Sequence, residues 1–225
     1  MRNTFVFATV VCLVCSVLLA LAAGLLKPYQ DYNVAIDKKK NILKALSLYE
    51  SGSTLTSSEI ESLYDENILE YVIDASGKKV EQSISELEKG SQLLPVYERK
   101  DNNYVALPVE GMGLWSLLQG YFALKADRHT VAGVTFYEQK ETAGLGAEIA
   151  KDWFVNNFKD KDILDSKGKL VSVSVAKGKA ADATGIDIKN CVDGISGATM
   201  TGRGVNNLLK KAVKAYRPFL EEKWN

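Results

Sequence analysis

The sequence predicts an α+β protein in which a single N-terminal transmembrane helix precedes one soluble domain with a largely antiparallel sheet flanked by helices. No charged residue occurs between Thr4 and Leu26, and a run of about 20 apolar residues is long enough to cross a bilayer. Strand-like segments cluster between helical ones without regular β–α alternation, which is typical of α+β folds. We therefore divide the chain into an anchor, residues 1–27, and a soluble domain, residues 28–225.

The apolar run is interpreted as an anchor rather than a cleaved signal peptide. It exceeds the roughly 7 to 15 residues of a signal-peptide core, although residues 20–22 (A-L-A) resemble a cleavage site. Only Arg2 precedes the run, whereas Lys27 and the three lysines at 38–40 follow it. By this count alone, the soluble domain would lie on the cytoplasmic side.

Two helices are expected ahead of the sheet. Residues 37–49 carry apolar side chains at helical spacing. Ser58 followed by Glu61 matches a capping box, and the helix that it opens is expected to include Ile68 and Tyr71. The remaining expected elements are strands at 94–98, 104–109, 130–137 and 170–176, and helices near 115–124, 148–158 and 205–216.

The composition argues against several classes of function. Positive and negative residues number 28 each, so no net field attracts nucleic acid. The single histidine, His129, lies in a polar turn and is expected to be a solvated loop residue rather than a metal ligand or base. We expect no metal site and no catalytic side chain.

The stretch from Asp193 to Gly204 concentrates small residues and hydroxyls ahead of an amphipathic helix. Glycines let a backbone approach a ligand closely, and a helix start attracts phosphate. The stretch matches neither the dinucleotide fingerprint nor the P-loop. A phosphate-bearing ligand is one interpretation; an unliganded connection that ends in an N-cap is the other.

Within this stretch, residues 193–199 (D-G-I-S-G-A-T) resemble the D-x-x-[ST]-G-A-T signature, at which a flavin transferase attaches FMN by a phosphoester to the final threonine. Two further blocks lie upstream in the family order. Residues 111–116 (G-M-G-L-W-S) resemble G-x-G-L-W-S, and residues 141–146 (E-T-A-G-L-G) resemble E-T-P-G-L-G.

Together with residues 37–43 and 95–97, these blocks make nearly the whole chain similar to the C subunit of the Na⁺-translocating NADH:quinone reductase. The sequence departs from that family at Ala143, where proline is usual, and at Gln139, where histidine is common. Loss of the proline removes a fixed φ from its loop.

The resemblance implies one covalently bound FMN per chain, joined to Thr199. It implies a pocket in which Leu114 and Leu145 lie against the ring, with Trp115 nearby and Thr142 with backbone amides at the polar edge. For Trp115, core packing is an equal alternative. The expected cofactor-binding residues are Thr199, Ser196, Gly197, Ala198, Thr201, Leu114, Trp115, Glu141, Thr142, Gly144, Leu145 and Gly146.

The other signature residues have alternative interpretations. Glu141 is either part of the pocket or a surface carboxylate. Asp193 and Ser196 have two interpretations, recognition by the transferase and Asx-turn hydrogen bonding, which are compatible with each other.

The resemblance also implies partners and a location. The chain would be a single-pass protein of the bacterial inner membrane with its soluble domain on the periplasmic side, against the lysine count. Electrons from NADH would arrive through an iron–sulfur centre held by neighbouring membrane subunits and leave toward the flavin of the B subunit. The implied partners are the B, D and E subunits, the rest of a six-subunit assembly, and a flavin transferase for maturation.

Two alternatives remain open. The G subunit of the related Rnf complex shares the signature and the anchor, although residues 37–43 and 111–116 favour the C subunit of the reductase. The chain could also be a membrane-tethered assembly or binding module without flavin. A hydrolase with Ser196 or Thr199 as nucleophile is disfavoured because no histidine lies nearby in the sequence.

Fluorescence on a denaturing gel separates the flavoprotein from the unflavinylated module. A covalent phosphoester survives denaturation, so we expect a fluorescent band for the chain purified from its own membrane. A dark band would contradict the flavoprotein interpretation.

Overall fold

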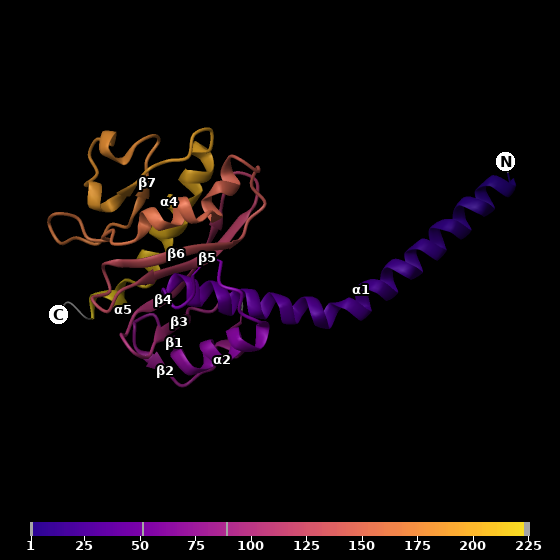
Figure 1. Cartoon of the computed structure of the whole chain (residues 1–225), viewed down its shortest axis with the longest axis horizontal. Helices are drawn as coiled ribbons and strands as arrows, with labels where there is room; N and C mark the ends of the chain where they lie inside the picture. Colours follow the sequence, from indigo (N-terminus) through magenta and orange to yellow (C-terminus); the bar gives the residue numbers. More distant parts are fainter. Residues whose placement is uncertain (1, 51, 89, 223–225) are drawn as a thin grey trace. The chain divides into compact units, whose positions relative to one another are not determined.

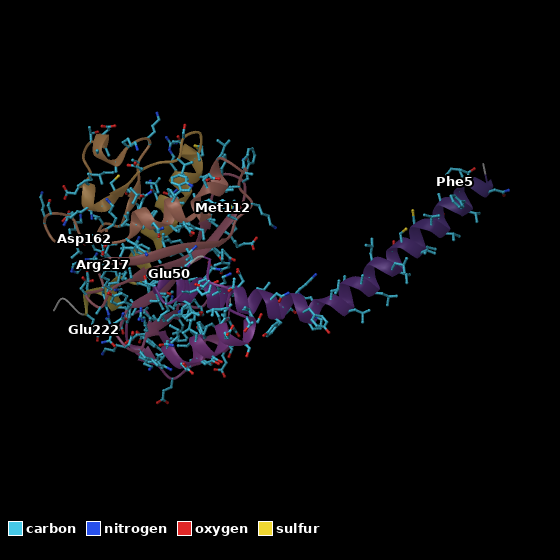
Figure 2. All side chains as sticks on the ribbon, viewed as in Figure 1. Phe5, Glu50, Met112, Asp162, Arg217 and Glu222 are labelled. Atoms are coloured by element: carbon cyan, nitrogen blue, oxygen red, sulfur yellow. The ribbon has the colours of Figure 1, made fainter. Side chains whose placement is uncertain are left out.

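The computed structural model describes residues 2–50, 52–88 and 90–222 (Figure 1). They form two compact units: one ends at Lys38 and the other starts at Lys39. The first unit consists of helix α1 (Arg2–Ala45) up to Lys38, and the last residues of that helix belong to the second unit. Among the described helices, this is the one that is long and apolar enough to cross a membrane. Its large apolar side chains from Phe5 to Val34 are exposed, and Phe5 projects outward in Figure 2.

The second unit is built on a six-stranded sheet of order β2-β1-β3-β4-β5-β6, in which every neighbouring pair is antiparallel. This confirms the predicted α+β class. The strands are β1 Ile68–Ile73, β2 Lys79–Val80, β3 Leu94–Arg99, β4 Val105–Met112, β5 Leu117–Leu124 and β6 Val131–Glu138. Two short strands, β7 Ser174–Val175 and β8 Cys191–Val192, pair in parallel as a separate ladder.

Helices surround the sheet, and most of those between β6 and α4 are short. The α-helices of this unit, besides the end of α1, are α2 Ser57–Asn67, α3 Asp152–Val155, α4 Thr199–Ala215 and α5 Arg217–Glu221. The 3₁₀ helices are η1 Ile84–Glu86, η2 Gly146–Ala150, η3 Asn156–Phe158, η4 Ala180–Asp182 and η5 Ile188–Asn190.

Side chains alternate across strand β6, so that its two faces contact different helices. Val134 belongs to the core cluster that α4 completes. The next residue, Thr135, faces the other way and donates to the carbonyl of Asn41 at 3.4 Å. A Cβ added to Gly133 would lie 2.6 Å from the carbonyl oxygen of Ala45. The sheet therefore lies between α4 and the C-terminal end of α1 (Figure 1).

Glycines bring α4 close to β4. A Cβ at Gly111 would lie 2.7 Å from the Cβ of Leu208, and a Cβ at Gly204 would lie 2.6 Å from the carbonyl oxygen of Met112. Such distances are too short for a real Cβ, so only glycine allows this approach. The contacts place the first turns of α4 beside the end of β4, where the β4–β5 hairpin begins.

The helix predicted near 115–124 is wrong, because this segment forms strand β5. Its register pairs Met112 with Leu117 and runs along β4 to Leu124. The sequence of a central strand that is buried on both faces is a continuous apolar run. Periodicity alone does not distinguish such a run from a helix. The G-x-G-L-W-S block is thus the tip of a hairpin.

The second helix is also placed differently from the prediction. Its capping box uses Thr56 and Glu59, not Ser58 and Glu61. The helix ends at Asn67, and Ile68 and Tyr71 belong to strand β1. Both pairs of hydroxyl and carboxylate have the three-residue spacing of a capping box, so the spacing did not determine which pair caps the helix.

Four further predicted elements need correction. The strand predicted at 170–176 is reduced to the two residues of β7, because Ser172 adopts φ +124° and breaks the extended backbone. The helix predicted at 148–158 is divided into η2, α3 and η3, and the one predicted at 37–49 is the end of α1, which stops at Ala45. The helix predicted at 205–216 starts earlier, at Thr199.

Replacement of Leu208 by alanine should lower the free energy of unfolding by about 2–5 kcal/mol, since it leaves a cavity where α4 meets the sheet. Urea unfolding of the full chain in detergent, followed by circular dichroism, measures this. Exposed Asn207→Ala, on the same helix, is the control and should change the value by less than about 0.5 kcal/mol. Equal effects of the two variants would contradict the packing of α4 on the sheet.

Candidate functional site

The signature residues 193–199 lead directly into α4, and Thr199 is the first residue of that helix. Ala198 occupies the N-cap position, with φ −117° and ψ 31°, and no side chain in the described part of the chain caps the helix there. Amides of a first helical turn lack intrahelical partners and carry partial positive charge. The preceding Gly197 has φ +76°, a conformation that favours glycine. The turn therefore presents a hydroxyl and backbone amides to an anionic ligand.

The carboxylate of Glu141 joins this helix to the β4–β5 hairpin. Its Oε2 accepts from the Thr201 hydroxyl at 2.6 Å and from the Leu114 N–H at 3.2 Å. Its Oε1 accepts from the Trp115 N–H at 2.9 Å, and from the N–H and hydroxyl of Ser116 at 3.1 and 3.3 Å. The side chain is only 8% exposed. This excludes the surface-carboxylate interpretation.

Two opposing effects act on the pKa of Glu141. Burial raises it, whereas the hydrogen bonds from Thr201 and from the backbone N–H groups of residues 114–116 lower it. The net pKa lies below the ordinary value of 4.5. The carboxylate is therefore ionised at neutral pH, which strengthens each of these hydrogen bonds.

Thr201 and Thr199 have different roles because of their positions on the helix. An α-helix turns by about 100° per residue, so side chains two positions apart point in nearly opposite directions. Thr201 is 1% exposed and is bonded to Glu141, whereas Thr199 is half-buried. Ser196 and Gly197 are exposed, and Ala198 is buried. The Thr201 hydroxyl is therefore bonded within the protein, whereas Thr199 is partly accessible to solvent.

The loop of the second block lies against the signature. The carbonyl of Thr142 accepts from the N–H groups of Leu145 and Ala147, both at 3.1 Å, and Gly144 has φ +75°. Leu145 is 41% exposed, and a Cβ at Gly197 would lie 2.8 Å from its Cδ2. The side chain of Leu145 therefore lies beside the loop that leads to Thr199.

Gly146 is a buried residue of the same loop and lies close to Thr201 and Glu141. A Cβ there would lie 2.5 Å from the Thr201 hydroxyl oxygen and 2.9 Å from Oε2 of Glu141. A glycine is therefore required if the loop, the carboxylate and α4 are to meet. Thr142, Ala143 and Gly144 are exposed.

The hairpin tip presents apolar side chains to solvent. Trp115 is 70% exposed and Leu114 43%. Met112 is also exposed and lies at the periphery of the domain (Figure 2). Core packing of Trp115 is therefore excluded. Exposed large apolar side chains beside a polar helix start indicate a surface that binds a ligand or a partner.

Gln139, which stands where the resembled family often has histidine, contributes to the same loop. Its side-chain oxygen accepts from the N–H of Glu141 at 2.8 Å. The hydroxyl of Ser116 accepts from the N–H of Lys140 at 2.7 Å. Ser116 thus connects the hairpin to the segment before Glu141, a role not assigned to it from the sequence although it lies within the first block.

Asp193 is the first residue of the signature, and its carboxylate contacts the start of η4. Its carboxylate accepts from the Ala180 N–H at 2.8 Å and pairs with Lys179 at 3.0 Å. The pKa of this carboxyl is lowered, first by the hydrogen bond from the Ala180 N–H and next by the hydrogen bond from Lys179. The Asx-turn interpretation is therefore wrong for Asp193, which joins the signature to Lys179 and the first residue of η4.

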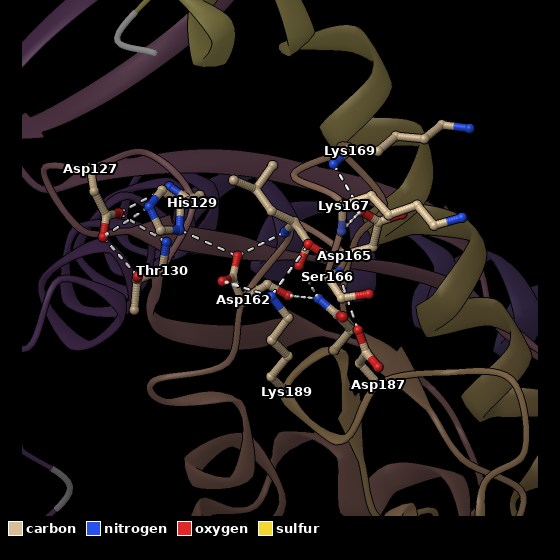
Figure 3. A network of polar contacts seen from close by, with 12 residues as sticks. Asp127, His129, Thr130, Asp162, Asp165, Ser166, Lys167, Lys169, Asp187 and Lys189 are labelled. Carbon is tan, nitrogen blue, oxygen red and sulfur yellow. Dashed lines mark hydrogen bonds and ion pairs between the residues drawn. The ribbon is translucent and has the colours of Figure 1, made fainter.

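His129 lies in a separate polar network (Figure 3). Its Nδ1 lies 3.3 Å from Oδ1 of Asp162, which also accepts from the Leu164 N–H at 2.8 Å. Lys189 pairs with the other oxygen of Asp162 at 3.6 Å. The imidazole is only 30% exposed, so the interpretation as a solvated loop residue needs correction: His129 joins the turn before β6 to the segment around Asp162.

All twelve residues predicted for the site lie in three segments: the hairpin tip, the Glu141 loop and the start of α4 with the turn before it. Four of them, Glu141, Gly146, Ala198 and Thr201, are buried. The others are exposed or half-buried. The structure thus separates a buried framework from a set of accessible residues.

Residues 113–214 match the family described as FMN-binding domain. The matched residues include 113–116 of the hairpin tip, the Glu141 loop and α4 up to Lys214. A solved structure of the C subunit of Na(+)-translocating NADH-quinone reductase from Parabacteroides distasonis aligns with a TM-score of 0.75 at 33% identity, covering 87% of this chain and 96% of that one. Shewanella oneidensis NqrC aligns with a TM-score of 0.67 at 24% identity, which supports the fold.

Two curated relatives, both named as the C subunit of Na(+)-translocating NADH-quinone reductase, come from Haemophilus ducreyi and Pseudomonas aeruginosa. Each is 34% identical to this chain over 92% of its length, and the alignments cover 88% and 89% of the relatives. The chain belongs to the family of C subunits of the Na(+)-translocating NADH-quinone reductases.

The depressed pKa of Glu141 predicts how stability depends on pH. A group whose pKa is lower in the folded state stabilises the fold above its unfolded pKa, and the contribution is lost as pH falls through the folded value. Glu141→Gln should therefore lower the free energy of unfolding by about 1.5–3 kcal/mol at pH 7, and the difference from wild type should shrink below pH 4.5. Exposed Glu138→Gln is the control. A difference that is constant from pH 7 to pH 3 would contradict the role of the charge.

Proposed function

We propose that this chain is the electron-relay subunit of a Na⁺-translocating NADH:quinone oxidoreductase, and that it carries one FMN joined through its phosphate to the hydroxyl of Thr199. Membership of the C-subunit family and the match to FMN-binding domains support the flavin. The observation that carries the attachment site is the convergence of three separate sequence blocks on the first turn of α4, with Thr199 at its outer surface.

The residues present fit a phosphate at this position. Thr199 supplies the hydroxyl, and the first-turn amides of a 17-residue helix without a side-chain cap in the described structure favour a negative charge. Gly197 keeps the approach open because it has no side chain.

The same surface fits the ring of a flavin. Leu114 and Leu145 are both partly exposed, and they come from the two loops that Glu141 and Gly197 bring to α4. We assign them to the two sides of the ring, with Trp115 nearby and Thr142 with the loop amides of Gly144 to Gly146 at its polar edge.

Bound FMN supplies the redox chemistry. The chain itself binds and orients: Thr199 anchors the phosphate, the leucines restrict the ring, and Glu141 with Thr201 keeps the loops together. A covalent link removes the binding equilibrium, so the occupancy of the site does not depend on the concentration of free flavin.

The membrane setting follows from the same assignment. Helix α1 would anchor the chain in the bacterial inner membrane beside the B, D and E subunits of a six-subunit assembly, with the domain from residue 28 on the periplasmic side. The likeness to the C-subunit family supports this orientation, and the lysine count at 38–40 opposes it. A flavin transferase would carry out the attachment.

Two other functions remain as alternatives. The G subunit of an Rnf complex would have the same attachment chemistry, and the named relatives favour the reductase over it. An unflavinylated membrane-tethered module is opposed by the exposed leucines and by the helix start without a side-chain cap, which leave the surface open.

Thr199→Val should abolish the attachment, because valine has no hydroxyl but keeps the shape of threonine. Intact mass spectrometry of the chain co-expressed with the flavin transferase measures this. Wild type and the control Thr184→Val, an exposed threonine between η4 and η5, should both show the added mass of one flavin nucleotide.

Retention of the added mass by Thr199→Val would reject Thr199 as the attachment residue. Absence of the mass from wild type as well would reject covalent flavin altogether.

A further inference from the structure

The acceptor capacity of Glu141 is fully used by the protein. A carboxylate offers about four lone-pair positions, and the two oxygens of Glu141 receive contacts from Leu114, Trp115, Ser116 and Thr201, with Ser116 contributing both its N–H and its hydroxyl. The contacting groups are backbone N–H groups and hydroxyls, not charged side chains. At 8% exposure, the carboxylate has neither the surface nor the free lone pairs to bind a further ligand.

These contacts fix the relative position of the two elements that would hold the flavin, the hairpin tip and the start of α4. Three consecutive N–H groups, from Leu114 to Ser116, converge on one carboxylate, an arrangement that fixes the backbone of the hairpin tip. The fourth partner, Thr201, lies in the first turn of α4, two residues after Thr199. Any shift of the carboxylate therefore moves Leu114 relative to Thr199.

Two glycines show how closely the surroundings fit the carboxylate. A Cβ at Gly113 would lie 2.7 Å from Oε1 of Glu141, and a Cβ at Gly146 would lie 2.9 Å from Oε2. Both loops approach the charge as closely as a backbone without side chain permits. The position of the carboxylate is thus determined from the hairpin, from its own loop and from α4.

We propose that Glu141 is a positioning residue for flavin attachment: it aligns the Thr199 hydroxyl with the hairpin tip through Thr201 and residues 114–116, and it does not itself contact the cofactor. This rests on the proposed function and deepens it, because it divides the motif block 141–146 into a framework residue, Glu141, and accessible residues such as Leu145.

The test measures the rate at which purified flavin transferase attaches flavin to the full-length chain in detergent, with Glu141→Gln, Thr201→Val, the double variant and the control Glu138→Gln. Glu141→Gln should lower kcat for attachment about tenfold, as expected when strong hydrogen bonds to a charge are replaced by weaker ones. KM for the flavin donor should be unchanged, because the donor is bound by the transferase. Glu138 is exposed, so its variant should match wild type.

Coupling between the two residues distinguishes positioning from direct contact. If Glu141 acts through Thr201, the double variant should be no slower than Glu141→Gln, whereas independent roles would give multiplied effects. Thr201→Val changes few atoms and tests the same path if Glu141→Gln folds poorly. The end-point yield of flavin, read by fluorescence on a denaturing gel, reports the folded fraction and should stay complete.

The outcomes separate this inference from the proposed function. An unchanged kcat in both single variants, or multiplied effects in the double variant, would overturn the positioning role while leaving the flavin in place. A wild-type chain that takes up no flavin would overturn the proposed function itself.

Discussion

A single buried carboxylate holds the candidate site together. The hydrogen bonds that Glu141 accepts connect a hairpin about 25 residues before it with a helix 60 residues after it. Because the group is ionised and shielded from water, each bond is stronger than one between neutral groups, and an unpaired donor in the same place would be costly. The positions of the accessible residues of the site depend on the hydrogen bonds that Glu141 accepts.

The rest of the fold provides the surfaces on which that arrangement is built. Strand β4 supports α4 through the close contacts at Gly111 and Gly204, and the hairpin emerges beside the first turn of the helix. On the other face of the sheet, the end of α1 packs against β6 through Gly133 and Thr135. Within the domain, the sheet therefore separates the candidate flavin surface from the segment that continues into the apolar helix.

The motif blocks could be recognised from the sequence because their residue types are unusual and their order is informative. The sequence could not show which residues of these blocks form the buried framework and which are accessible. Glu141 and Thr142 are adjacent polar residues, yet one is buried and the other exposed. Thr199 and Thr201 differ in the same way, since only the start of α4 at Thr199 determines which direction each hydroxyl takes. The apolar run of β5 was mistaken for a helix for a related reason, because burial on both faces removes the periodic signal.

The sequence by itself determined the apolar anchor segment, the α+β class, the family resemblance and the three blocks, because these depend on composition and on the order of residues along the chain. Only the tertiary structure decided that the blocks meet at the start of α4, that Trp115 lies at the surface, and that Asp193 bonds to the start of η4. The physical reason is that hydrogen bonds and burial join residues across space. A donor such as Thr201 finds its acceptor 60 positions away, where no local pattern records the pairing.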